Sequence, residues 1–228
     1  MLEITATGLT KRFARRAVVR GFAHRFAPGS TTAVSGHNGS GKSTLLRLLS
    51  GQLLPTAGVV GFRISGTDVP DERRYRQVSL TGPYLELVEE LSGEELLRFH
   101  ARVRGFRQNL QVADLWDRLD WPRALRRERI GAYSSGMKQR IRLLLALATE
   151  APCVMLDEPT ANLDAEGVDW YRRLLADWTD ARTLIVASNE ERDFPAGAAR
   201  IDPTFWRKPK TSHQVPTGPT PRDSPDSP

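Results

Sequence analysis

A glycine-rich segment that follows a short apolar run constrains this chain more than any other feature of its sequence. Residues 31–35 are mostly apolar or β-branched, and leucines recur at helical spacing from residue 45, so the segment is expected to join a strand to a helix. Glycine adopts positive φ without strain, which lets successive N–H groups point at one anion beside the positive end of the helix. The segment is therefore predicted to bind phosphate groups. Its predicted contact residues are Gly36, Asn38, Gly39, Ser40, Gly41, Lys42, Ser43 and Thr44.

Two side chains of this segment have distinct predicted tasks. Lys42 would supply a mobile cation to the phosphates, and the Ser43 hydroxyl, one residue later, would be a ligand of Mg²⁺. A glycine-rich turn that merely resembles the pattern is the alternative. The strand and the helix predicted on either side disfavour that alternative.

Two adjacent carboxylates end a second apolar run, at residues 153–156. In open α/β sheets ligands bind at the carboxyl ends of strands, where Asp157 and Glu158 would lie. Asp157 is expected to hold Mg²⁺ through water, and Glu158, on the other side of the strand, could polarise or deprotonate an attacking water. Alone, such a pair is usually a solvated turn. Together with the glycine-rich segment it predicts the second half of a nucleotide site.

Short apolar runs alternate with longer segments of helical periodicity, which predicts an α/β fold with helices packed on a largely parallel sheet. Strands are expected at residues 2–4, 31–35, 78–80, 153–156 and 184–187. Between the third and fourth of these lies a helical stretch, residues 94–148, whose first helix would place Leu96, Leu97, Phe99 and Val103 at helical spacing. Residues 208–228 are rich in proline, serine and threonine and are predicted to be a disordered tail.

Composition excludes several classes of protein. The chain has 228 residues and one cysteine, Cys153, so it can form no internal disulfide. No apolar run approaches the roughly 20 residues that a membrane-spanning helix needs. The N-terminus has an acidic residue and no basic and apolar leader, which favours a cytoplasmic protein. The net charge of +6 could indicate nucleic acid, an anionic membrane face or nucleotide phosphate as a partner, but the basic residues are scattered, which favours a solvated surface, and charge alone does not decide between these.

Residues 133–140, Tyr-Ser-Ser-Gly-Met-Lys-Gln-Arg, resemble the signature segment of the ABC ATPases, with Ser135 in place of a glycine and Met137 in place of a glutamine. Ser134 can also cap the helix that follows, and an ordinary cap is the alternative. The resemblance covers about residues 1–206. It implies an ABC ATPase domain at residues 1–207: a P-loop NTPase core with a mainly parallel sheet, N-terminal antiparallel β elements and an α-helical subdomain inserted at about residues 84–148.

The resemblance also implies cofactors, partners and further site residues. ATP and Mg²⁺ would bind between two copies, as a homodimer or pseudo-dimer, with Ser134, Ser135 and Gly136 touching the nucleotide held by the other copy. Phe13 resembles the aromatic residue that stacks on adenine, although a lone phenylalanine near a strand is more often part of the core. Asp164 belongs to a segment that resembles the D-loop and can also cap a helix.

Two departures from the family pattern bear on catalysis. Asn189 follows the last predicted core strand where family members usually have a histidine. An asparagine can hydrogen-bond a γ-phosphate but cannot carry a charge or shuttle a proton. Between residues 80 and 91 the usual glutamine is missing, and Tyr84 stands at about its place. Hydrolysis involving Glu158, Lys42 and Asn189 could therefore be slow.

The resemblance implies an ATP-hydrolysing subunit that drives a separate transmembrane permease subunit from the inner face of the plasma membrane. The small size resembles ATPases of the haem-exporter, cytochrome c maturation and drug-efflux types. The alternative is a nucleotide-gated, weakly hydrolysing module with a regulatory or non-transport role. A soluble ABC ATPase acting on ribosomes, DNA or iron–sulfur assembly is disfavoured, because the chain has neither a second cassette nor long coiled coils, and no nucleic acid is expected as a partner.

Overall fold

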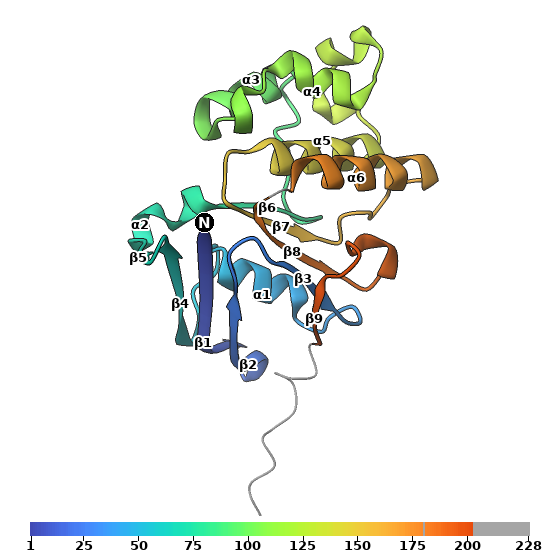
Figure 1. Ribbon diagram of the computed structural model, residues 1–228. Coiled ribbons are helices and arrows are strands. Elements are labelled where there is room, and N and C mark those ends of the chain that lie inside the picture. The colour runs from blue at the N-terminus through green and yellow to red at the C-terminus, as the bar shows by residue number, and fades with distance from the viewer. Residues whose placement is uncertain (180, 203–228) are drawn as a thin grey trace, which may run out of the picture.

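The chain forms two β-sheets of different topology in the computed structural model, which describes residues 1–179 and 181–202 (Figure 1). The first is antiparallel, in the order β2-β1-β4-β5, and the second is parallel, in the order β6-β7-β8-β3-β9. The antiparallel strands are β1 (Leu2–Phe13), β2 (Arg16–Phe26), β4 (Ala57–Ile64) and β5 (Thr67–Asp68). The parallel strands are β3 (Thr31–Ser35), β6 (Val78–Thr81), β7 (Cys153–Asp157), β8 (Thr183–Ser188) and β9 (Ala199–Ile201).

The parallel sheet is covered on both faces, because successive side chains of each strand point in opposite directions. Cys153 and Met155 of β7 pack in the hydrophobic cluster that contains helix α1 (Lys42–Leu49). Val154 and Leu156 pack in the cluster that contains helices α5 (Ser135–Ala148) and α6 (Ala165–Trp178). Figure 1 shows α1 on one side of the sheet and α5 and α6 on the other.

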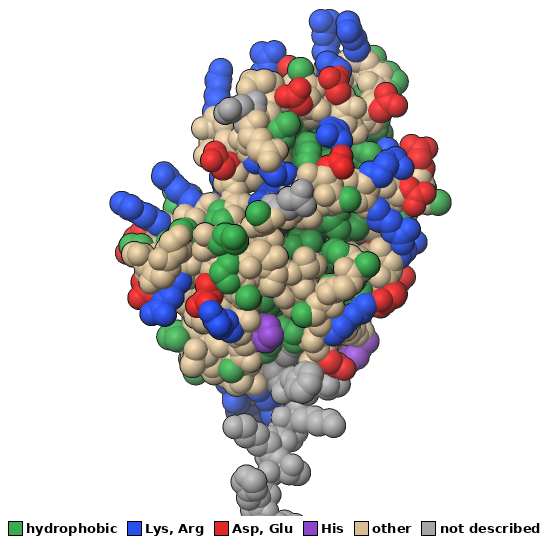
Figure 2. All heavy atoms as spheres, in the orientation of Figure 1, with side chains coloured by type: hydrophobic (Ala, Val, Ile, Leu, Met, Phe, Trp, Pro, Cys, Tyr) green, Lys and Arg blue, Asp and Glu red, His purple; other side chains and the backbone are tan. Residues whose placement is uncertain are grey.

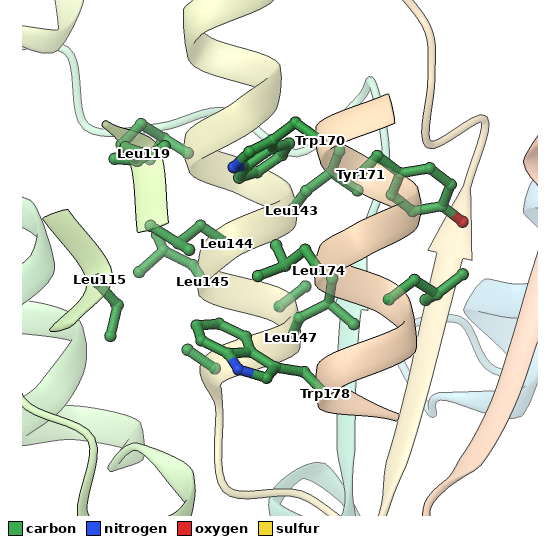
Figure 3. Close-up of a cluster of buried hydrophobic side chains, with 14 of the residues drawn as sticks. Leu115, Leu119, Leu143, Leu144, Leu145, Leu147, Trp170, Tyr171, Leu174 and Trp178 are labelled. Carbon is green, nitrogen blue, oxygen red and sulfur yellow. The ribbon is translucent and has the colours of Figure 1, made fainter. Parts of the chain in front are cut away.

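The interface between α5 and α6 is built from leucines and aromatic residues. Figure 3 shows Leu143 and Leu147 of α5 next to Leu174 of α6, and all three are buried. Burying a leucine side chain contributes roughly 1.5–3 kcal/mol, so this interface is a major source of stability on that face of the sheet. It also fixes where the N-terminus of α5 lies.

The region between β6 and β7 is helical, as expected. It contains α3 (Gly93–Arg104), α4 (Val112–Leu119) and α5, and 3-10 turns at Arg107–Asn109, Arg123–Arg127 and Ile130–Ala132. The four apolar residues expected at helical spacing lie on α3, where Leu96 and Leu97 are buried but Phe99 and Val103 are 55% and 61% exposed. The α3 helix thus buries a narrower stripe than its apolar spacing indicates. Short helix α2 (Asp71–Arg74) and 3-10 turns at Tyr75–Gln77 and Glu191–Asp193 complete the described elements.

The predicted fold class is confirmed: an α/β protein with a parallel core sheet, N-terminal antiparallel strands and helices between β6 and β7. Within the described ranges no helix is long and apolar enough to cross a bilayer. Figure 2 shows basic and acidic side chains mixed over the helical end of the molecule, in agreement with a solvated surface. The predicted tail at residues 208–228 and the last residues of the predicted domain lie outside the described residues.

Candidate nucleotide-binding site

The glycine-rich segment connects β3 to α1 at the carboxyl end of the parallel sheet. Gly39 and Gly41 have φ of 72° and 102°, values that residues with a side chain rarely adopt. The Gly36 N–H donates to Ser188 O at 3.3 Å, which ties the loop to the end of β8. Gly41 is the N-cap of helix α1 and provides no side-chain cap, and the first turn of the helix has no acidic residue. Its N-terminus can therefore attract an anion.

Lys42 joins this loop to the end of β7. Its side chain is only 4% exposed, and its Nζ donates to Gly36 O at 2.8 Å. The same Nζ lies 3.1 Å from Glu158 Oε1. The structure thus brings together two of the predicted catalytic residues, from segments far apart in the sequence. A buried ammonium is stable only with such partners, because burial without them costs several kcal/mol.

Glu158 sits at a constrained position directly after β7. Its φ is 46°, uncommon for a residue with a side chain, and its N–H donates to Ala187 O at 2.8 Å. Its Oε2 accepts a hydrogen bond from Ser188 Oγ at 2.9 Å and a longer one from Asn189 N at 3.5 Å. Both carboxylate oxygens of Glu158 are therefore held, one by Lys42 and the other by the end of β8.

Asp157 is fully buried, and neither of its carboxylate oxygens has a partner in good hydrogen-bond geometry, although the Ser43 and Tyr84 hydroxyls lie close enough to act on its pKa. Burial raises the pKa of Asp157 to about 6, while the nearby Ser43 hydroxyl acts in the opposite direction. A buried carboxylate with open lone pairs beside a serine hydroxyl has the donor atoms that Mg²⁺ prefers. Ser43 and Asp157 thus lie in positions where they could share a cation.

Tyr84 lies beside Asp157, on the segment where the family's glutamine is missing. Burial, and next the negative charge of Asp157, raise the pKa of the Tyr84 hydroxyl. The Arg47 guanidinium lies 5.5 Å from the ring centroid. A Cβ on Gly82 would come within 3.0 Å of the Asp157 Cβ, so the chain approaches the carboxylate closely only because this residue is a glycine. Sequence reasoning did not single out Gly82.

The signature residues lie elsewhere. Ser134 caps α5, its Oγ accepting from Met137 N at 3.2 Å, and Ser135 is exposed. Because α5 covers the face of the sheet opposite to α1, the sheet separates these residues from the glycine-rich loop of the same chain. The start of α5 packs instead on the segment after Glu158, where a Cβ on Gly136 would come within 2.9 Å of Asn162 O.

Three further predicted residues occupy informative places. Phe13, at the end of β1, is 48% exposed, so the alternative that it belongs to the core is wrong. Asp164 caps α6, accepting from Gly167 N at 2.8 Å, as expected. Asn189 is exposed just beyond β8. Sequence reasoning missed Ser188, the residue before Asn189, whose hydroxyl contacts Glu158. Its position at a strand end was the available signal.

The chain is similar to several known proteins. The family model described as ABC transporter matches residues 19–161. The daunorubicin resistance ATP-binding protein DrrA3 of Streptomyces coeruleorubidus is 36% identical over 170 residues, 72% of this chain and 52% of the relative. The ATP-binding protein Uup of Caulobacter vibrioides is 32% identical over 195 residues, 84% of this chain and 30% of the relative. This chain thus spans about half of one relative and a third of the other.

A relative of similar length is the cytochrome c biogenesis ATP-binding export protein CcmA of Haemophilus influenzae, 30% identical over 191 residues, 83% of this chain and 89% of the relative. Among solved structures, a putative ABC transporter ATP-binding protein from Pyrococcus furiosus has a TM-score of 0.73 at 18% identity, over 90% of this chain and 98% of that one. A dimeric bacterial ABC transporter cassette has a TM-score of 0.70 at 19% identity, over 88% and 94% of the two chains. At these identities the structures show a shared fold.

Proposed function

Because the chain belongs to the ABC transporter family of ATP-binding proteins, we propose that it hydrolyses ATP with Mg²⁺ and thereby drives a separate membrane protein. The observation that carries this proposal is the meeting of Lys42, Glu158 and Asp157 at one glycine-rich helix start. A cation for phosphates, a carboxylate for water and a carboxylate for a metal are the groups that phosphoryl transfer needs.

The residues of the site fit both cofactors. The N–H groups around Gly39 and Gly41 and the Lys42 ammonium would hold the phosphates, and the exposed Phe13 ring could stack on adenine. Ser43 and Asp157 would hold Mg²⁺, as the unpartnered oxygens of Asp157 indicate. When bound, the ion supplies positive charge that stabilises the oxygens of the transferred phosphoryl group.

In this proposal the ion pair between Lys42 and Glu158 opens when nucleotide enters. Lys42 turns to the phosphates, and the freed Glu158 Oε1 faces the γ-phosphate, where it can orient or deprotonate a water molecule. Asn189 would donate a hydrogen bond to the γ-phosphate without supplying a charge. The site therefore lacks one charged group of the usual set, and slow turnover is expected.

A second copy would complete the site. Ser134, Ser135 and Gly136 begin a helix that has no acidic residue in its first turn, yet the sheet keeps them from the phosphate loop of their own chain. Across a two-fold axis the same residues of another copy could meet the phosphates. Solved neighbours include an ABC transporter cassette described as dimeric, which supports this arrangement.

The membrane partner would bind beside Tyr84. A cavity of about 150 Å³ lies between β6, the segment after it, α3 and α5, with His100, Arg104 and Arg142 in its wall. Tyr84, Val88, Phe99 and Val103 expose apolar surface on the segments that line it. A contiguous exposed apolar patch marks an interaction site, and these four side chains would form one. A short helix of a permease could bind at this cavity, and its binding would hold the protein at the membrane surface.

Single-turnover hydrolysis of ATP by the purified protein, with and without Mg²⁺, tests the proposal. Glu158→Gln keeps the size of the side chain but removes the base, so phosphate release should fall by about 10²-fold or more while ATP binding is kept. Glu90→Gln, which changes an exposed glutamate, is the matched control. Absence of magnesium-dependent hydrolysis in the wild-type protein would contradict the proposal.

A second candidate function is a nucleotide-gated module that closes on ATP but hydrolyses it weakly. The observation that favours it is the neutral Asn189, whose backbone N–H alone reaches Glu158. For such a module, ATP would shift the monomer–dimer equilibrium, and Glu158→Gln would leave phosphate release unchanged. Light scattering and phosphate release on the same sample separate the two functions.

A further inference from the structure

A second buried carboxylate lies behind Glu158 and is absent from the proposed mechanism. Asp193, in the 3-10 turn Glu191–Asp193 after β8, is 1% exposed. Its Oδ2 is 2.6 Å from Ser188 Oγ, and its Oδ1 accepts a hydrogen bond from Thr160 Oγ1 at 2.5 Å. Its backbone carbonyl accepts from the Tyr171 hydroxyl at 3.0 Å. Asp193 is therefore fixed by β8, by α6 and by the segment after β7.

Ser188 connects this carboxylate to Glu158. The Ser188 Oγ lies 2.9 Å from Glu158 Oε2 and 2.6 Å from Asp193 Oδ2, and it accepts the N–H of Glu190 at 3.0 Å. A serine hydroxyl has one proton to donate and two lone pairs that accept. All three contacts are favourable when Asp193 carries a proton on Oδ2, donates it to Ser188, and Ser188 donates its own proton to Glu158.

The surroundings of Asp193 agree with this arrangement. Burial raises the pKa of Asp193, and the hydrogen-bonding contacts with Ser188 and Thr160 oppose this effect without reversing it. The order of the strands explains the geometry: β8 lies between β7 and β3, so its last residue, Ser188, stands between Glu158 and the glycine-rich loop. Ser188 thus contacts Glu158 from a position that the sheet fixes.

We propose that Asp193 is a positioning residue that orients Glu158 through the Ser188 hydroxyl. This inference rests on the proposed function, because it concerns the residue that would activate water. Asp193 touches Ser188 and Thr160 rather than the reacting groups. Its contribution is to hold the Ser188 proton on Glu158 Oε2, which leaves Oε1 free to face water once Lys42 has turned to the phosphates.

The test compares Asp193→Asn, Asp193→Ala and Ser188→Ala with the wild-type protein. An asparagine can reproduce the protonated carboxyl, with its carbonyl oxygen toward Thr160 and its amide toward Ser188, so the kcat for ATP hydrolysis should stay within about threefold of the wild-type value. Asp193→Ala and Ser188→Ala should lower kcat by about tenfold or more, because misplaced catalytic groups lose rate steeply, while KM for ATP changes little. Ser50→Ala, which removes another buried serine hydroxyl, is the matched control.

The double variant Ser188→Ala with Asp193→Ala separates positioning from general destabilisation. If Asp193 acts through Ser188, the double variant should be no slower than Ser188→Ala alone. Melting curves of each variant show whether the fold is kept. If Asp193→Ala does not fold, the kcat values of Ser188→Ala and Asp193→Asn still test the inference. A wild-type kcat in Ser188→Ala, or an equal loss in Asp193→Asn and Ser188→Ala, overturns the inference and leaves ATP hydrolysis standing. A wild-type protein without hydrolysis overturns the proposed function, and this inference with it.

Discussion

The N-termini of α1 and α5 have the same chemistry but different surroundings. Neither helix has an acidic residue in its first turn, whereas α3, α4 and α6 have Glu94, Asp114 and Glu166 there. An acidic residue in the first turn would neutralise the positive end of the helix and repel an anion. The N-termini of both helices can therefore attract a negatively charged partner.

The two helix N-termini differ in how far the surrounding chain encloses them. The start of α1 is surrounded by the glycine-rich loop, the buried Lys42 and the carboxylates after β7. The start of α5 presents exposed Ser134 and Ser135 on the opposite face of the sheet. We infer that one helix start is a site within the chain and the other is half of a site between chains. Four predictions can break or sharpen this comparison.

The largest effect is expected at the enclosed site. Lys42→Ala removes the cation from the phosphates and leaves Glu158 unpaired, so ATP hydrolysis should fall by about 10²–10³-fold and ATP affinity should fall with it. Calorimetry and phosphate release measure the two quantities. Arg63→Ala removes an exposed cation of the antiparallel sheet and is the control. Undiminished ATP binding by Lys42→Ala would show that the site is not at α1.

Asp157 should make stability depend on pH. Its pKa of about 6 lies above the usual 3.8, so the folded protein holds this proton more tightly than the unfolded chain. The resulting stabilisation is present below pH 3.8 and is lost as the pH rises through 6, by up to about 3 kcal/mol. Without nucleotide or metal, Asp157→Asn should therefore be more stable than wild type at pH 8 in urea unfolding, and the gap should shrink toward pH 4.

With ATP and Mg²⁺ present, the wild-type protein should instead be more stable than Asp157→Asn, because the asparagine lacks the negative charge that Mg²⁺ needs. Asp169→Asn, at an exposed aspartate of α6, is the control and should show neither effect. An equal stability difference with and without ATP and Mg²⁺ would argue against a metal at Asp157.

The open helix start is tested by Ser135→Glu. A carboxylate there should repel the phosphates held by the other copy and weaken ATP-driven dimerisation by about tenfold or more. It should leave the stability of the single chain unchanged or raised by about 0.3–1 kcal/mol, because an acid suits a helix N-terminus. Light scattering in a Glu158→Gln background measures dimerisation, and Ser135→Gln is the neutral control. Unweakened dimers would remove α5 from the interface.

The smallest effect belongs to the cap of α5. Ser134→Ala removes the hydrogen bond that Met137 N–H donates, at an expected cost of about 1 kcal/mol in the free energy of unfolding. Chemical denaturation measures this change, and Ser134→Asp, which keeps a capping oxygen, should restore most of the stability. A loss of ATP affinity in the monomer would instead place Ser134 at the site of its own chain.

The sequence predicted the parallel core better than the antiparallel sheet. Strands β3, β6, β7 and β8 are buried on both faces and read as apolar runs. Strand β1 buries alternate residues such as Leu2, Ile4 and Ala6, and only its first few residues read as a strand. The residue pattern did not locate strands β2, β4 and β5, because their many exposed residues hide it, and only the family resemblance implied antiparallel strands near the N-terminus. Strand β9, with three residues, is too short for a periodic signal.

Some residues of the candidate site were likewise predicted from the sequence, and others were not. Its glycines, Lys42, Ser43, Asp157 and Glu158 were predicted, because each has a local signal: a loop between a strand and a helix, or a charge at a strand end. Ser188 and Asp193 were not, because a serine and an aspartate beyond a strand have many ordinary roles. The exposure of Phe99 on α3 also could not be read from its spacing, since burial depends on which neighbours cover the helix.

The amino-acid sequence by itself determined where the backbone can wrap an anion and which side chains stand at the ends of the core strands. These properties depend on φ preferences and periodicity over a few residues. Only the tertiary structure decided that Lys42 meets Glu158 across the end of β8, that Asp157 is buried with open oxygens, and that α5 starts on the far face of the sheet. The reason is that strand order and helix packing come from contacts between distant segments, which no local pattern encodes.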